Sequence, residues 1–266
     1  LVVLGHVQTT AQTLVHGTAV VLRGQAQLRL NGGTQQRTPI LVQTIALKLD
    51  PRYAAAHSNM LLCMNYESRF AHTEVYEAHR RWAEVHLNGV QRYSGHINSP
   101  EPGRRLRIGY VSPDFRQHSV AYFIRPIIRH HERANFEVFV YASVASPDSV
   151  TQEIELLSDQ FRNIAGLSDD AAAALIRQDG IDILVDLAGH SAFNRLLVLA
   201  QKPAPVQVTW LGYPNTTGLS EVDYRITDGR VDPEGAQDRY YSEKLVRLPH
   251  NFLCYSPLRQ CPDITS

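Results

Sequence analysis

The sequence has few of the features that mark secreted, membrane-spanning or nucleic-acid-binding proteins. Only three of the 266 residues are cysteines, too few and too scattered for a disulfide framework or a four-ligand zinc site. No run approaches about 18 consecutive apolar residues, which excludes a transmembrane helix of ordinary length. Lys plus Arg and Asp plus Glu number 26 each, so no overall positive field is present to attract nucleic acid or anionic lipid. We therefore expect a protein of a reducing, cytoplasmic compartment without nucleic-acid or membrane partners.

Several sequence motifs of nucleotide and catalytic sites are also missing. Gly109–Ser112, at the end of the first strand predicted below, does not supply the GxGxxG of dinucleotide-binding folds. The P-loop pattern GxxxxGK[ST], the GxSxG elbow and the HExxH zinc motif do not occur. No DxD-like pair follows a predicted strand in a convincing context. The sequence thus predicts no metal site and no cofactor.

Both ends of the chain have the character of a fragment. The chain starts at Leu1 without a signal-peptide pattern, and Pro262–Ser266 reads as a loop that closes no domain, so 256–266 is interpreted as a truncated tail. Within residues 1–44, Gln, Thr and Gly interrupt every helical period, and Gly32, Gly33 and Pro39 break what remains. We predict no structure for residues 1–44.

Residues 45–92 predict a small group of antiparallel helices. A first helix ends at Leu49, because Asp50 precedes a proline and is disfavoured in the helical region. A second helix includes His57–Leu62. A third has one apolar face, formed at three- and four-residue steps by Ala71, Val75, Ala78, Trp82 and Val85. A linker rich in Ser, Gly and Pro follows at 93–103.

Strands and helices alternate between residues 104 and 255. The predicted strands lie at 106–111, 136–141, 161–164, 181–187, 206–211 and 222–227, and the predicted helices at 120–131, 150–159, 169–178 and 195–200. One helix between successive strands implies right-handed crossovers and a parallel sheet covered on both faces. The predicted fold is therefore α/β, a Rossmann-like doubly wound domain preceded by a small all-α segment.

Ligands of such sheets bind outside the carboxyl ends of the strands. Three polar loops are predicted to leave that edge: 112–118, 188–191 and 212–218. Each loop contains at least one residue of three kinds: glycine, histidine, or a residue with a hydroxyl side chain. We expect the three loops to share one crevice.

Histidines in two of these loops are candidate functional groups. His118 begins a predicted helix, whose N-terminus disfavours an imidazolium, so a neutral, proton-accepting ring is expected there. The alternative is a helix cap bonded to local backbone. His190 follows a small Ala-Gly pair and either faces a ligand or is a loop residue bonded to backbone.

The remaining candidates surround these histidines. The loop from Gly212 to Gly218, with Asn215, Thr216 and Thr217, can offer N–H and hydroxyl donors to an oxygen-rich ligand, although a plain turn needs the same residue types. Asp186, within a buried strand, needs partners and either orients His190 or His118 or is satisfied structurally. Asp114 is interpreted as a helix cap.

Four blocks of sequence resemble the protein O-linked N-acetylglucosamine transferases, the family that includes the plant Spindly proteins. The blocks follow one another in the order and with similar spacing to the family, and they are 105–119, 179–190, 203–218 and 223–228, the last followed by Tyr241–Leu245 and Leu248-Pro249. Leu47–Pro51 resembles the end of a tetratricopeptide repeat, and 73–86 the helices that join such repeats to the catalytic region. The resemblance covers about residues 45–255.

The resemblance implies an inverting, metal-independent glycosyltransferase of the GT-B type, with two facing Rossmann-like domains, of which this chain holds the first. His118 matches the histidine proposed as general base beside the acceptor hydroxyl. The sugar-side contacts would come from the loops that contain Gly189, His190, Tyr213, Asn215, Thr216, Thr217 and Gly218. The donor is UDP-GlcNAc, and the acceptors are Ser or Thr of proteins, bound with help from the tetratricopeptide-like helices.

Two departures from the family and two alternatives remain open. Phe193 stands where the family usually has glycine, and residues 1–44 lack the repeat signature. In the family that the chain resembles, the uridine diphosphate of the donor is held mainly by the second domain, so we predict no transfer by this chain alone. The alternatives are a protein O-fucosyltransferase that uses GDP-fucose and a non-catalytic protein-binding module.

Overall fold

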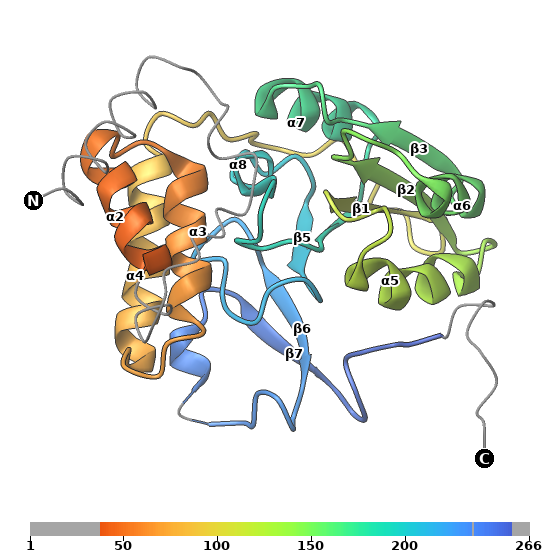
Figure 1. Cartoon of the computed structure of the whole chain (residues 1–266). Helices are drawn as coiled ribbons and strands as arrows, with labels where there is room; N and C mark the ends of the chain where they lie inside the picture. The colour runs from red at the N-terminus through yellow and green to blue at the C-terminus, as the bar shows by residue number, and fades with distance from the viewer. Residues whose placement is uncertain (1–37, 236, 257–266) are drawn as a thin grey trace, which may run out of the picture.

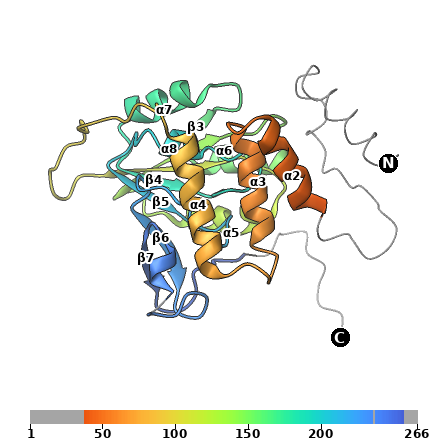
Figure 2. The same cartoon turned by 90° about the vertical axis from the view of Figure 1, so that its left-hand side faces the viewer.

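A computed structural model describes residues 38–235 and 237–256. Most of the segment 1–44 and of the predicted tail therefore lies outside the described residues. A group of helices flanks one side of a parallel sheet, which carries further helices of its own (Figures 1 and 2). No helix in the described ranges is long and apolar enough to cross a membrane.

Three helices precede the sheet, at α2 (Thr38–Leu49), α3 (Ala54–Met64) and α4 (His72–His86). α2 ends before Asp50-Pro51 as predicted, but it begins within the segment for which no structure was predicted. Pro39 does not interrupt it, because proline is tolerated in the first turn, where backbone N–H groups have no intrahelical partner. On α4, the predicted apolar stripe is buried at Val75 and Trp82.

The predicted α/β architecture is confirmed, with seven parallel strands in the order β3-β2-β1-β4-β5-β6-β7. The strands are β1 (Leu106–Ser112), β2 (Phe136–Ala142), β3 (Gln160–Asn163), β4 (Ile183–Asp186), β5 (Val206–Thr209), β6 (Tyr224–Asp228) and β7 (Lys244–Leu248). The helices between them are α5 (Ser119–His130), α6 (Ser149–Leu157), α7 (Asp169–Gln178) and α8 (Leu196–Leu199), and a short 3₁₀ helix spans Asp238–Tyr240. β7 was not predicted; it is an edge strand whose residues are half-buried or exposed, which weakens the hydrophobic pattern.

Two hydrophobic cores lie on the two faces of the sheet. α5 and α6 cover one face, where Ile124 and Ile154 pack on Val140. α7 and α8 cover the other face, where Ile176 and Leu199 are fully buried. Apolar residues of α3 and α4 belong to this second core. Figure 2 shows the two helices in front of the sheet, so they pack on the α/β domain itself.

The sheet has a topological switch point between β1 and β4. β1 pairs with β2 on one side and with β4 on the other, and β4 also pairs with β5. Val111 lies opposite Asp186, and Asp186 opposite Thr209, so the loops after these three strands leave from adjacent positions at one edge. The chain after β1 turns to the face covered by α5, and the chain after β4 turns to the face covered by α8. Ligands of doubly wound sheets bind at such a crevice.

Candidate functional site

His118 lies at the N-terminus of α5, at the end of the loop that follows β1. Its Nδ1 accepts a hydrogen bond from the Val120 N–H at 3.3 Å, which makes it the N-cap residue of the helix. The same nitrogen is 3.7 Å from Oδ2 of Asp114, and 36% of the His118 side chain is exposed. The imidazole is thus a loosely bonded cap that solvent or a substrate can reach.

Asp114 forms the buried side of this pair. Its N–H donates to Ser112 Oγ at 3.0 Å, and its Oδ1 is 3.4 Å from an Arg116 guanidinium nitrogen. Burial raises the pKa of the Asp114 carboxyl, and the neighbouring His118 and Arg116 oppose that rise. A buried carboxyl beside a half-exposed imidazole is an arrangement that can share and pass on a proton.

The loop after β4 is shaped by Asp186. Its carboxylate accepts hydrogen bonds from the N–H groups of Ala188 and Gly189, at 3.1 and 2.8 Å, and from the Thr209 hydroxyl at 2.9 Å. Burial raises the pKa of Asp186 to about 6. The carboxylate therefore fixes the turn directly and influences His190 only through the backbone that presents it.

His190 is fully buried beneath the preceding helices. Its Nε2 is 2.8 Å from the carbonyl oxygen of Thr217, and its Nδ1 is 3.1 Å from the Ser58 hydroxyl on α3. Because a carbonyl oxygen only accepts, Nε2 must carry the proton, and Nδ1 accepts from Ser58. Burial lowers the pKa of His190 well below its ordinary value. The neutral imidazole thus links the loop after β4 to a helix 132 residues earlier in the chain.

Tyr213, in the loop after β5, is held in the same way. Its hydroxyl is 2.7 Å from Nε2 of His79 on α4 and accepts from the Asn65 amide at 2.8 Å. His79 Nδ1 is 2.6 Å from the Val75 carbonyl oxygen, so Nδ1 donates there and Nε2 accepts from Tyr213. Burial lowers the pKa of His79 to about 4 and raises that of Tyr213.

The threonines of the same loop bond to a buried carboxylate. Glu243 accepts from the Thr216 hydroxyl and the Thr217 N–H, each at 2.7 Å, and also from the Thr217 hydroxyl. Asn215 donates to the Asn65 side chain at 2.8 Å. These donors, predicted to face an oxygen-rich ligand, are thus occupied within the protein.

Two of the predicted glycines are required by close approaches between segments. Gly218 has φ of 76°, and a Cβ there would lie 2.4 Å from the His79 carbonyl oxygen. Gly189 has φ of 51°, and its Cβ would lie 2.3 Å from the Tyr213 Cβ. Both the left-handed backbone and the space available exclude a side chain. Gly218 therefore brings the loop against α4, and Gly189 brings the two loops together.

We call the group formed by Ser58, Asn65, His79, His190 and Tyr213 the histidine clamp. Among the residues that the structure describes, no hydrogen bond links His118 to the seven other predicted site residues. His190, Tyr213 and Asn215 bond to Ser58, His79 and Asn65, Gly189 and Gly218 allow close approaches between segments, and Thr216 and Thr217 bond to Glu243. Their predicted sugar contacts stay predictions.

Sequence reasoning missed four residues that fix these loops, namely Ser58, Asn65, His79 and Glu243. One of them left a signal. His79 lies four residues after Val75 and three before Trp82, on the apolar stripe of α4. A polar residue on such a stripe needs a buried partner. The partner, Tyr213, is 134 residues away and could not be named from periodicity.

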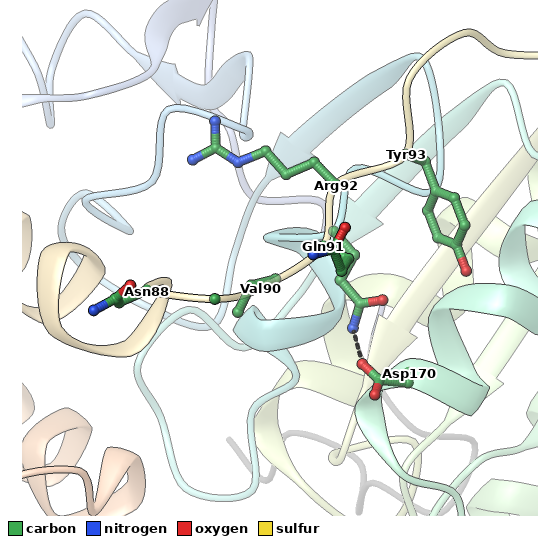
Figure 3. Close-up of a pocket in the computed structure, with 8 residues that line it drawn as sticks. Asn88, Val90, Gln91, Arg92, Tyr93 and Asp170 are labelled. Carbon is green, nitrogen blue, oxygen red and sulfur yellow. Dashed lines mark hydrogen bonds between the residues drawn. The ribbon is translucent and has the colours of Figure 1, made fainter.

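Two cavities flank the site. One of about 480 Å³ lies along the chain that follows α4, and Asp170 there accepts from the Gln201 amide at 2.9 Å (Figure 3). None of the predicted site residues lines it. A second, of about 280 Å³, lies between α3 and the loop after β4. Within the described ranges, no group of three or more His, Cys, Asp or Glu could hold a metal ion.

Comparison with known proteins identifies relatives over most of the chain. The profile of glycosyl transferase family 41 matches residues 35–259. Two SPINDLY proteins, each named a probable UDP-N-acetylglucosamine–peptide N-acetylglucosaminyltransferase, are similar to it: that of Solanum lycopersicum is 46% identical over 215 residues and that of Arabidopsis thaliana 44% over 214. Each alignment covers 79% of this chain and 23% of the relative. The chain thus spans about a quarter of the length of these relatives.

A solved structure has the same fold. The chain is similar to a mutant of the O-GlcNAc transferase of Thermobaculum terrenum, with a TM-score of 0.83 and 38% sequence identity. The match covers 87% of this chain and 44% of that one.

Proposed function

Because the chain belongs to glycosyl transferase family 41, we propose that it forms the acceptor-side half of an enzyme that transfers N-acetylglucosamine from UDP-GlcNAc to Ser or Thr hydroxyls of proteins. The donor and the peptide acceptor of this proposal are those that the two SPINDLY relatives are named for. The observation that carries the proposal is the half-exposed imidazole of His118 at the switch point of the sheet.

In the proposed reaction, His118 receives the proton of the acceptor hydroxyl. The hydroxyl oxygen forms a bond to the anomeric carbon while the bond from that carbon to the diphosphate breaks and UDP leaves. Nε2 of His118 can accept the proton only when Nδ1 carries one, so in the proposed reaction Nδ1 gives up the 3.3 Å bond that it accepts from the Val120 N–H and donates instead to the Asp114 carboxyl, which is 3.7 Å away. General-base catalysis of this kind contributes about 10²–10⁴-fold.

In this proposal the loops that contain Gly189, His190, Tyr213 and 215–218 shape the site but do not take part in proton transfer. They form the sugar side of the crevice, and the histidine clamp holds their shape. α2–α4 are proposed to guide protein acceptors toward it. Support comes from the fixed loop geometry, in which the imidazole of His190 and the hydroxyls of Thr216 and Thr217 are already bonded inside the protein.

In the proposed reaction, the negative charge on the departing diphosphate must be stabilised by groups outside this half of the enzyme. Transfer needs donors aimed at the leaving group while the hydroxyl loses its proton. The chain matches 44% of the solved transferase. We therefore expect no glycosyl transfer by residues 1–266 alone.

The test is a chimera in which this chain replaces the matching half of the T. terrenum transferase. Transfer from radiolabelled UDP-GlcNAc to Ser and Thr peptides is measured, with GDP-fucose as a parallel donor. We expect transfer by the chimera with UDP-GlcNAc, and a loss of about 10²-fold or more in His118→Ala. The control is His130→Ala, an exposed histidine at the far end of the same helix. Equal rates in His118→Ala and the parent would refute the assignment of the base.

A further inference from the structure

The cavity of about 280 Å³ has a strained aromatic residue at its rim. Phe193, in the loop after β4, has φ of 60°, a conformation that costs free energy for any residue with a bulky side chain. The residue is nevertheless 73% exposed, so the strain is not offset by burial in the hydrophobic core. Strain and exposure together at a bulky apolar residue indicate a role other than packing.

The lining of the cavity favours a neutral peptide over a nucleotide. Asn59 and Trp82 line it from α3 and α4, Tyr53 from the position just before α3, and Ser191 and Phe193 from the loop. No Lys, Arg or His is among the lining residues, and the one carboxylate, Asp169, is paired with Arg195 at 2.9 Å. Its volume is smaller than the roughly 300–1,000 Å³ of pockets that enclose whole small ligands. It therefore suits one large uncharged side chain.

A serine in the same wall has a buried hydroxyl without a partner among the described residues. Ser191 Oγ is buried and has no hydrogen-bond partner in the part of the chain that the structure describes. Buried hydroxyls are normally bonded, so this oxygen, which solvent does not reach, would bond to a ligand in the cavity after a rotation of the Ser191 side chain. A peptide backbone offers both groups next to the side chain that would enter.

The position of the cavity connects it to the proposed base. It is built on the loop that leaves β4, and the loop with His118 leaves β1, the strand paired with β4. Asp169, at the start of α7, adds a third segment from the carboxyl edge of the sheet. A peptide whose hydroxyl is at the switch point can therefore extend over this edge toward α3.

We propose that this cavity is a subsite for an aromatic or other large apolar side chain of the acceptor protein, near the modified Ser or Thr, and that Phe193 determines the preference. The inference rests on the proposed function, since it takes the acceptor to be a protein. Aromatic pairs favour stacked or edge-to-face contact, which Phe193 and Tyr53 can offer from the two walls.

The experiment measures binding of the 266-residue chain to 11-residue peptides with Ser at the centre and Ala or Gly elsewhere. One flanking position at a time is changed to Phe, Tyr, Leu, Lys or Glu. We expect at least fivefold tighter binding with Phe or Tyr at one flanking position than with Ala there. Phe193→Gly, which relieves the strained backbone, should lose this preference while its melting temperature stays equal or rises. Phe193→Asn, also tolerant of positive φ, should behave like Phe193→Gly.

The matched control is Leu156→Ala, which removes another largely exposed apolar side chain from α6, a helix with no residue in the cavity lining. It should keep the aromatic preference. The inference fails if the preference is absent, or if it persists in Phe193→Gly. Transfer assays with the chimera distinguish a failure of the subsite proposal from a failure of the proposed function. Transfer without a Phe193-dependent preference overturns the subsite alone, and the preference without transfer overturns the transferase assignment alone.

Discussion

Two parts of one sheet edge, the loop after β1 and the loops after β4 and β5, both carry polar side chains but lie in different environments. The first presents His118 half-exposed, with one 3.3 Å cap bond. The second presents His190 fully buried, with bonds to α3 and to the neighbouring loop. The difference follows from the switch point, because the chain after β4 turns to the face that α3 and α4 also cover. Loops at equivalent positions of a sheet edge can thus be exposed or buried, depending on the face of the sheet to which the chain turns after the strand.

The largest loss of stability is expected from a substitution in the buried loops after β4 and β5. His190→Ala removes a buried ring, leaves the Thr217 carbonyl oxygen and the Ser58 hydroxyl unpaired, and creates a cavity beside Trp82. We expect the free energy of unfolding to fall by about 4 kcal/mol. Urea denaturation of the purified chain measures it. A loss no larger than that of His118→Ala would contradict the comparison.

A second, smaller effect is expected on acidification. His79 has its ordinary pKa of 6.5 when unfolded and a pKa of about 4 when folded, so between these values the unfolded chain binds more protons. The stability present above pH 6.5 is therefore lost as the pH falls toward 4, by about 3 kcal/mol for this imidazole. His57 and His190 act in the same direction. Asp186, whose pKa is raised to about 6, acts in the opposite one.

The measurement is the urea midpoint between pH 7.5 and 4.5. His79→Gln keeps one donor and one acceptor but does not titrate, so its stability should fall less steeply with acidification than that of the parent. Identical slopes for the two proteins would show that His79 is not held neutral by the clamp.

The smallest loss of stability is expected from a substitution in the partly exposed loop after β1. His118→Ala removes a weak cap and a ring that is partly exposed, with no strong hydrogen bond, so the free energy of unfolding should fall by less than about 1 kcal/mol. His118→Asn, which retains a capping side chain, should restore most of it. Thermal unfolding of the three proteins checks this. A loss of several kcal/mol would place His118 in the packed core with His190.

Some features of the site could be predicted from the sequence and others could not, because only some depend on residues that are close together in the chain. The alternation of apolar strands and helices predicted the parallel sheet and the edge from which the loops leave, because side-chain periodicity reflects burial on each face. His118 could be placed at a helix start from local sequence alone. Nothing local showed that Thr216 and Thr217 bond to Glu243, 27 and 26 residues later, in a segment not predicted to be a strand or part of the site.

The sequence by itself determined the fold class, the family and the positions of the three loops, since strand pattern and crossover handedness depend on short stretches of chain. Only the tertiary structure decided which of those loops remain open. That outcome depends on contacts such as Ser58 with His190 and His79 with Tyr213, which join residues more than 130 positions apart. Such pairs form because a buried polar group must find a partner, and the partner available is set by how the helices dock on the sheet.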